Sequence, residues 1–221
     1  MDELVKCEHL FKIYNAADEF RALDDVSVEI NRGDFVSIMG PSGCGKSTLL
    51  NILGLLDKPT KGEYYLDGKA VSRLTDAEIT RLRRNHIGFV FQSFNLMPKL
   101  SVVENIALPM RYSDIPRNKI LPKARELAER FGLGNKLNNT PLQLSGGQCQ
   151  RVACARSLAN SPSVILADEP TGNLDSKSSA DILALLKELN EGGMTIVMVT
   201  HDPKIAEGTQ RIIRIKDGKI Q

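Results

Sequence analysis

The sequence predicts an α/β fold with a mostly parallel sheet core, an N-terminal antiparallel β layer and an inserted helical lobe. Continuous apolar runs that end in a glycine loop or in polar residues predict the buried strands of the core. They are residues 35–39, 87–91, 164–168 and 194–200. Between residues 93 and 143 the apolar pattern is helical and prolines interrupt it, which predicts the lobe. We therefore expect a single domain over 1–221, with a helical subdomain at 93–143 and the core and β layer formed by 1–92 and 144–221.

The composition of the 221 residues is that of an ordinary globular chain, with 42% hydrophobic and 25% charged residues. A net charge of +2 is too small to indicate nucleic-acid binding, and we interpret the basic cluster Arg81–Arg84 as a solvated helix face. The four cysteines include no C-x-x-C pair, which favours free thiols over a metal site. Because no apolar run approaches the length of a membrane span or a signal region, we expect a soluble, cytoplasmic chain.

The N-terminal β layer is predicted from residues 4–14 and 22–30, which show strand-like alternation. A turn signal at residues 31–34 then leads into the first core strand. Tyr14 is a candidate platform for a nucleotide base, since aromatic faces stack on bases. Packing within the β layer explains Tyr14 equally well at this point.

A glycine-rich stretch from Gly40 to Ser47 matches the phosphate-binding P-loop pattern. Its glycines allow successive backbone N–H groups to point at a polyphosphate, and the positive end of the following helix attracts the same anion. Lys46 is placed to reach the β- and γ-phosphates, and the Ser47 hydroxyl to ligate Mg²⁺. The sequence therefore predicts a nucleoside triphosphate site made by Gly40, Pro41, Ser42, Gly43, Cys44, Gly45, Lys46, Ser47 and Thr48. We interpret Cys44 as a small residue tolerated in this loop rather than as a reactive thiol.

The next elements are a helix from Lys46 to about Leu56, a turn over 57–62 and a short strand ending at residues 67–68. Thr75-x-x-Glu78 is a capping box that opens a further helix. Gln92 follows the apolar strand 87–91, at the strand end where parallel α/β sheets place ligand contacts. Its amide oxygen could bind a metal, and a surface turn is the alternative.

Within the predicted lobe, Ser101-x-x-Glu104 caps one helix and an apolar face marks a second, which glycines end. The core then returns with the apolar strand that ends at Asp168, followed at once by Glu169. An apolar strand that ends in aspartate downstream of a P-loop is typical of a Walker B motif, whose acid holds Mg²⁺. Glu169 stands where a hydrolytic water needs a base, although two acids could instead cap a helix.

His201 follows the last buried strand, where the γ-phosphate should lie, and this place favours a functional role over a structural one. A final strand over 211–216 and a turn at Asp217–Gly218 are predicted to close the chain. Ser145–Gly147, just ahead of an alanine-rich helix, offers N–H groups, a hydroxyl and a helix dipole as a second anion site. Two phosphate sites and one P-loop in a single chain favour a dimer that shares its nucleotides.

These motifs, in this order, make the sequence similar to the ATP-binding cassette family over essentially its whole length. The resemblance implies that Gly40–Thr48 is Walker A, Leu144–Gln148 the signature and Val164–Asp168 Walker B. It further implies single-residue roles: the A-loop aromatic for Tyr14, the Q-loop glutamine for Gln92, the D-loop aspartate for Asp175 and the switch histidine for His201. Residues 56–62, 87–98 and 168–175 resemble the group that contains LolD, MacB and FtsE. Cys149 departs from the family pattern, since polar residues are usual after the signature.

The resemblance implies an ABC ATPase fold and an ATP hydrolase that closes head to tail around two MgATP. In this arrangement Lys46, Glu169 and His201 would carry catalysis, while Ser47, Gln92 and Asp168 would hold the metal. Ser145, Gly146, Gly147 and Gln148 would complete the nucleotide pocket of the partner copy. The implied partner is a membrane permease with a large extracytoplasmic domain, which would keep the chain on the inner face of the membrane. No nucleic acid is expected.

Three other functions compete with this one. A P-loop kinase would have no use for residues 144–148, and a DNA-repair cassette would need a coiled-coil insertion for which 92–144 has no room. A mechanical ATPase of the FtsE kind, acting on a cell-wall partner, remains open as an alternative to transport.

Overall fold

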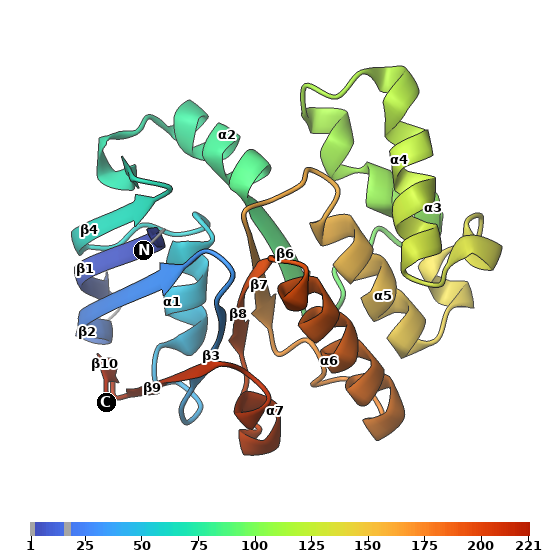
Figure 1. The fold of residues 1–221 in the computed structure, drawn as a ribbon. Coiled ribbons are helices and arrows are strands. Elements are labelled where there is room, and N and C mark those ends of the chain that lie inside the picture. The colour runs from blue at the N-terminus through green and yellow to red at the C-terminus, as the bar shows by residue number, and fades with distance from the viewer. Residues whose placement is uncertain (1–2, 16–18) are drawn as a thin grey trace. The chain divides into compact units, whose positions relative to one another are not determined.

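The computed structural model describes residues 3–15 and 19–221. It divides into two compact units, Met1–Arg83 with Leu189–Gln221 and Arg84–Glu188, which are described separately (Figure 1). None of the helices in the described part of the chain combines the length and the apolar character that a membrane span needs.

The first unit contains the antiparallel β layer that the sequence predicts. Its strands are β1 (Glu3–Asn15), β2 (Glu19–Asn31), β4 (Lys61–Leu66) and β5 (Lys69–Ala70), in the order β2-β1-β4-β5. Alternate residues of β2 are buried, including Val26, Val28 and Ile30, which confirms the predicted apolar face. This alternation is what a sheet with one packed face requires.

Parallel strands form the second layer of this unit. Strand β3 (Phe35–Met39) pairs in parallel with β8 (Thr195–Val199) and with β9 (Arg211–Lys216). All five residues of β3 and of β8 are buried, as expected for strands covered on both faces. The predicted closing turn is a hairpin turn instead, because the chain continues into β10 (Lys219–Ile220), antiparallel to β9.

The helices of this unit are α1 (Lys46–Leu53), the short η1 (Val71–Arg73), α2 (Asp76–His86) and α7 (Pro203–Glu207). Helices α1 and α2 begin where the sequence signals predict, although α1 ends at Leu53 rather than near Leu56, and η1 and α7 were not predicted. The Thr75 capping box is present, since the Thr75 N–H donates to Glu78 Oε2 over 2.8 Å and the Glu78 N–H donates to Thr75 Oγ1 over 3.3 Å. This reciprocal pair satisfies two of the N–H groups that every helix start leaves without a partner.

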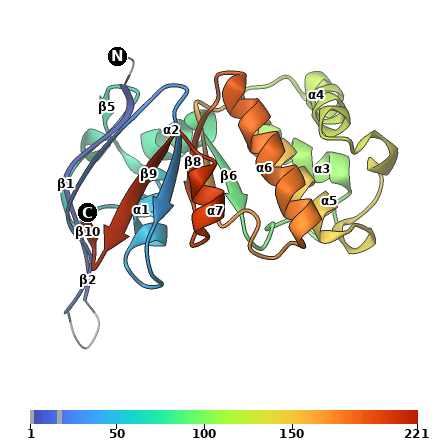
Figure 2. The same cartoon turned by 60° about the horizontal axis from the view of Figure 1, so that its bottom comes forward.

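The second unit consists of two parallel strands and their helices (Figure 2). The strands are β6 (Ile87–Phe91) and β7 (Val164–Asp168), and the helices are α3 (Val102–Ala107), α4 (Arg117–Arg130), α5 (Gly146–Ser157) and α6 (Ser176–Glu191). Between residues 93 and 143 the chain forms only helices and the short turns η2 (Pro109–Tyr112), η3 (Gly134–Lys136) and η4 (Pro141–Gln143).

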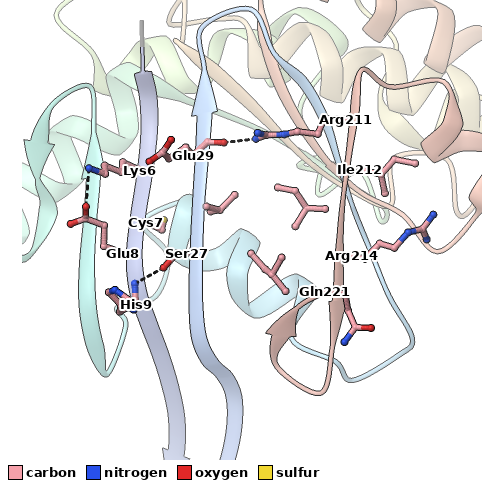
Figure 3. A pocket seen from close by; sticks show the side chains of 13 residues that line it. Lys6, Cys7, Glu8, His9, Ser27, Glu29, Arg211, Ile212, Arg214 and Gln221 are labelled. Atoms are coloured by element: carbon pink, nitrogen blue, oxygen red, sulfur yellow. Dashed lines mark hydrogen bonds and ion pairs between the residues drawn. The ribbon is translucent and has the colours of Figure 1, made fainter. Parts of the chain in front are cut away.

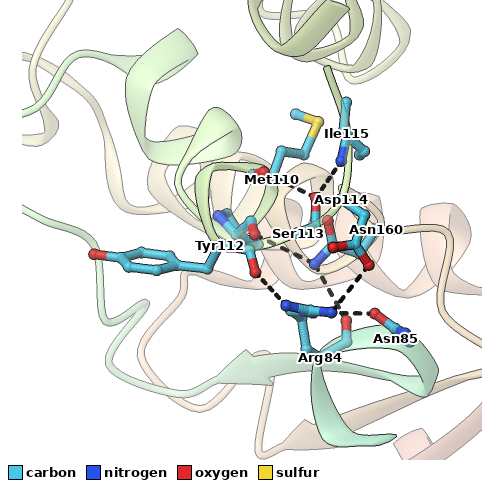
Figure 4. Close-up of polar contacts among 9 residues, drawn as sticks. Arg84, Asn85, Met110, Tyr112, Ser113, Asp114, Ile115 and Asn160 are labelled. Carbon is cyan, nitrogen blue, oxygen red and sulfur yellow. Dashed lines mark hydrogen bonds and ion pairs between the residues drawn. The ribbon is translucent and has the colours of Figure 1, made fainter. Parts of the chain in front are cut away.

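Arg84 is a structural hub of this unit rather than part of a solvated face (Figure 4). Its guanidinium donates to the Tyr112 carbonyl oxygen over 2.5 Å and pairs with Asp114 at 3.3 Å. The Asn160 amide donates to the carbonyl oxygens of Arg84 and Pro109. In the first unit Arg83 likewise donates to the Leu55 carbonyl over 2.7 Å. The interpretation of Arg81–Arg84 as a solvated face was therefore wrong for two of its arginines, because carbonyls distant in sequence bind them.

One buried hydrogen bond tests the packing of the β layer on α1. Tyr64 on β4 is 2% exposed, and its hydroxyl donates to the Leu53 carbonyl over 2.7 Å. We expect Tyr64→Phe to lower the free energy of unfolding by about 1–2 kcal/mol, because the buried carbonyl loses its donor. Urea denaturation measures the change. The matched control is Tyr65→Phe at the half-buried neighbouring residue, expected to cost less than about 0.5 kcal/mol. Equal losses in the two variants would contradict this packing.

Candidate functional site

The P-loop of the first unit runs from the end of β3 into α1, as the sequence predicts. Gly45 is the N-cap of α1 with a φ of 105°, and a Cβ there would lie 2.3 Å from the Ala22 carbonyl oxygen. Only glycine therefore fits this position. No side chain caps α1 and its first turn contains no acidic residue, which leaves its N-terminal N–H groups directed at the loop. This arrangement is suited to an anion.

Lys46 lies almost buried at the base of this loop, with 7% of its surface exposed. Its Nζ donates to the carbonyl oxygens of Gly40 and Pro41, each over 2.8 Å. An ammonium group has three donors, of which these two carbonyls take two. The third donor is therefore left for a phosphate oxygen bound at the loop.

Tyr14 lies on β1 in the same unit and is 40% exposed. Its hydroxyl donates to Asp57 Oδ2 over 2.9 Å, and Lys12 Nζ lies 4.9 Å from the centroid of its ring. Partial burial and the hydrogen bond to Asp57 raise the pKa of the Tyr14 hydroxyl, while a hydrogen bond with Thr48 of the P-loop helix lowers it. The structure thus joins Tyr14 to the helix that follows the phosphate loop.

His201 lies two residues after the end of β8 and is exposed. The Thr200 N–H donates to the Ile38 carbonyl over 3.2 Å, which fixes the end of β8 against the strand that leads into the P-loop. Asp202 then caps α7 by accepting from the Lys204 N–H over 2.9 Å. His201 is therefore held between two ordered elements of the first unit.

In the second unit, Gln92, Asp168 and Glu169 gather at the carboxyl ends of neighbouring strands. Phe91 on β6 is paired with Asp168 on β7, so the residues that follow each strand leave the sheet at the same edge. Glu169 has a φ of 44°, a left-handed conformation that is uncommon for a residue with a side chain. Such conformations cluster at functional sites, which supports the predicted role of Glu169.

Two further residues near this edge, Asn173 and Gln150, were not predicted as site residues. The Gln92 amide donates to Asn173 Oδ1 over 3.1 Å, and the Asn173 amide donates to the Gln92 carbonyl over 3.2 Å. Gln150 on α5 is fully buried and its Nε2 donates to the carbonyl oxygens of Phe91 and Pro170. Gln150 therefore connects α5 to the backbone beside Gln92 and beside Glu169. These partners are remote in sequence, and residue type and local spacing could not reveal them.

Ser145 starts α5 and caps it, with its Oγ accepting from the Gln148 N–H over 3.3 Å. Ser145 and Gly146 are exposed, and Gly147 approaches α6 so closely that a Cβ would lie 2.8 Å from Ser178 Oγ. Asp175 accepts from the Ser178 hydroxyl and N–H, and these bonds lower the pKa of Asp175. The beginnings of α5 and α6 therefore lie close together in the second unit, and each is closed by its own cap.

All four cysteines are buried and free. Burial raises the pKa of the Cys149 thiol and raises that of Cys154 to about 12. Protonated thiols are poor nucleophiles, so the departure at Cys149 adds no reactive group to α5.

A groove of about 740 Å³ in the first unit lies away from the P-loop, between β2 and β9 (Figure 3). The Arg211 guanidinium donates across it to the Glu29 carbonyl, and Lys6 pairs with Glu8 at 2.8 Å on its wall. None of the predicted site residues lines this groove.

Comparison with known proteins agrees with this geometry. The ABC transporter family matches residues 23–172. An uncharacterized ABC transporter ATP-binding protein of Thermotoga maritima is 49% identical over 222 residues, covering 100% of this chain and 95% of that protein. The macrolide export ATP-binding/permease protein MacB of Aggregatibacter actinomycetemcomitans is 52% identical over 198 residues, which are 90% of this chain but only 31% of that longer protein.

Solved structures agree as well. The cassette MJ0796 of Methanocaldococcus jannaschii, in a dimeric post-hydrolysis state bound to ADP and Pi, matches with a TM-score of 0.89 and 48% identity. The match covers 99% of this chain and 97% of that one. The predicted α/β cassette fold is therefore confirmed. The chain belongs to the ABC transporter family, and it is an ATP-hydrolysing cassette of that family.

Proposed function

We propose that two copies of this chain close head to tail around two MgATP and thereby drive a partner membrane permease. The observation that carries the proposal is the start of α5, where an exposed serine-glycine turn presents N–H groups and a hydroxyl at a helix N-terminus. The γ-phosphate held by the P-loop of a second copy is the anion that would cover it. The dimeric state of the MJ0796 cassette supports this arrangement.

Each pocket would combine residues of both copies. Lys46 and the N–H groups of the P-loop would bind the phosphates, and Tyr14 would stack on the adenine ring. Glu169 would orient or deprotonate the attacking water, while His201 would contact the γ-phosphate. Ser145 and Gly147 of the other copy would complete the cradle, with Gln148 and Asp175 beside them. Catalysis would rest mainly on positioning and on stabilising charge.

Mg²⁺ fits the side chains proposed to hold it. Ser47, Gln92 and Asp168 supply hydroxyl, amide and carboxylate oxygens, the hard donors that this ion prefers. No group of three His, Cys, Asp or Glu side chains in the described residues could hold a metal by itself, and Mg²⁺ is usually bound by one or two carboxylates together with substrate phosphates. When bound, the ion neutralises charge that develops on the phosphates.

The permease is proposed to be of the lipoprotein-release or macrolide- and peptide-export type, with a large extracytoplasmic domain. The MacB relative supports this choice, because its name joins an ATP-binding part and a permease in one protein. The helical subdomain, residues 93–143, would pass motion to the permease through Phe94–Pro98 and Glu104, with the cassette on the inner face of the membrane.

We expect Glu169→Gln to bind MgATP with an unchanged Kd but to hydrolyse it slower by a factor on the order of a thousand, equivalent to about 4 kcal/mol of barrier. Phosphate release and equilibrium binding of a fluorescent ATP analogue measure the two properties. Glu188→Gln on the exposed face of α6 is the matched control and should turn over normally. Near-normal turnover by Glu169→Gln would remove Glu169 from its proposed role.

In the Glu169→Gln background, MgATP should produce a dimer at low salt, and adding Ser145→Ala should abolish it. Ser101→Ala is the matched control, since Ser101 caps α3 with the same box and its Oγ accepts from the Glu104 N–H at 3.4 Å. Each substitution costs its helix a cap, about 1 kcal/mol, but only Ser145 should contact a nucleotide. Sedimentation measures both. A dimer that survives Ser145→Ala, or that Ser101→Ala weakens equally, would count against the shared pocket.

A further inference from the structure

We infer that Asp57 and Lys12 are positioning residues for Tyr14, and that the turn from Asp57 to Thr60 sets where the base of the bound nucleotide lies. The inference deepens the proposed function, because it assumes that Tyr14 stacks on that base. All the residues that carry it belong to the first unit of the chain.

The Asp57 carboxylate bridges two side chains of β1. Its Oδ2 accepts from the Tyr14 hydroxyl over 2.9 Å, and its Oδ1 accepts from Lys12 Nζ over 2.6 Å. Burial opposes the ionised form of Asp57, but the hydrogen bonds from Lys12 and Tyr14 outweigh it and lower its pKa. Oδ1 also accepts from the Lys58 N–H over 2.8 Å, so the carboxylate holds three donors, and its charge makes these bonds stronger than neutral ones.

The same turn is bound to β1 along its backbone. Lys12 Nζ also donates to the Lys58 carbonyl over 2.8 Å, and the Ile13 N–H donates to Thr60 Oγ1 over 3.0 Å. The Thr60 N–H donates to the Phe11 carbonyl over 2.7 Å. At its other end the Asp57 N–H donates to the Asn51 carbonyl of α1 over 3.3 Å. The helix that presents donors to the phosphates thus also anchors the strand that carries Tyr14.

Lys12 adds a restraint on the face of the ring. Its side chain is only 12% exposed, and its ammonium lies 4.9 Å from the ring centroid, within range of a cation–π contact. One face of Tyr14 therefore lies against the ammonium, and a base stacks on the other. The hydroxyl of Tyr14 and one face of its ring are both held, so the side chain loses little conformational entropy when a nucleotide binds.

The experiment compares MgATP with magnesium tripolyphosphate, which has no base, as competitors of a fluorescent ATP analogue. Tyr14→Phe and Asp57→Asn should each raise the Kd for MgATP about fivefold and leave that for tripolyphosphate unchanged. The double variant should raise the Kd by less than the product of the two single effects, since both substitutions weaken the bond between Tyr14 and Asp57. Lys12→Met should also raise the Kd for MgATP and leave that for tripolyphosphate unchanged.

Two matched controls separate positioning from folding. Asp76→Asn removes a carboxylate that pairs with Lys58 at 2.7 Å, where both side chains are largely exposed, and should leave both Kd values unchanged. Tyr64→Phe removes a tyrosine hydroxyl from the same β layer, and should lower stability without changing either Kd.

The inference would be overturned if Asp57→Asn raised the Kd values for MgATP and for tripolyphosphate equally. It would also be overturned if the increases in Kd caused by Asp57→Asn and by Tyr14→Phe multiplied in the double variant. A wild-type chain that binds tripolyphosphate but shows no preference for MgATP would overturn the base platform itself. Failure of the wild-type chain to bind MgATP at all would instead overturn the proposed function, so the two failures are distinguishable.

Discussion

The first unit depends on a cation that is almost buried within a loop. Lys46 is 7% exposed, and burying an ammonium group costs much free energy unless it is paired. The carbonyl oxygens of Gly40 and Pro41 offset that cost, and they can do so only because the loop curls around the lysine. The close approach at Gly45 and the pairing of β3 with β8 and β9 hold the two ends of this loop. The same curl directs the first N–H groups of α1 toward an anion, so packing and phosphate binding require one conformation.

In the second unit, the N-termini of α5 and α6 combine helix capping with the proposed anion site. Ser145 caps α5 and Asp175 caps the first turn of α6, and the short distance between Gly147 and Ser178 places these beginnings together. A serine that caps its own helix keeps its hydroxyl at the helix N-terminus, where the dipole favours an anion. Local helix stability and the proposed recognition of a partner's nucleotide therefore use the same atoms.

Several site residues could be predicted because their signals are local. The P-loop and the capping boxes at Thr75 and Ser101 each lie within a few residues of sequence, and the structure contains both boxes. It also shows a third box at Ser145, where only a helix start had been predicted. Asn173 and Gln150 could not be predicted in this way. Asn173 meets Gln92 across 81 residues, and Gln150 meets Phe91 across 59. Such contacts exist only once β6 and β7 pair, because the pairing brings their loops to one edge.

The sequence by itself determined the cassette fold and the kind of chemistry, because buried strands, glycine loops and helix caps impose their patterns over short stretches of chain. From the residues alone, the role of Tyr14 was open between stacking on a base and packing in the β layer, and Arg83 and Arg84 were assigned to a solvated face. Only the tertiary structure decided that carbonyls bind these arginines and that Asp57, 43 residues from Tyr14, holds its hydroxyl. The physical reason is that a side chain takes its partner from whatever the fold brings near, and sequence spacing does not record that distance.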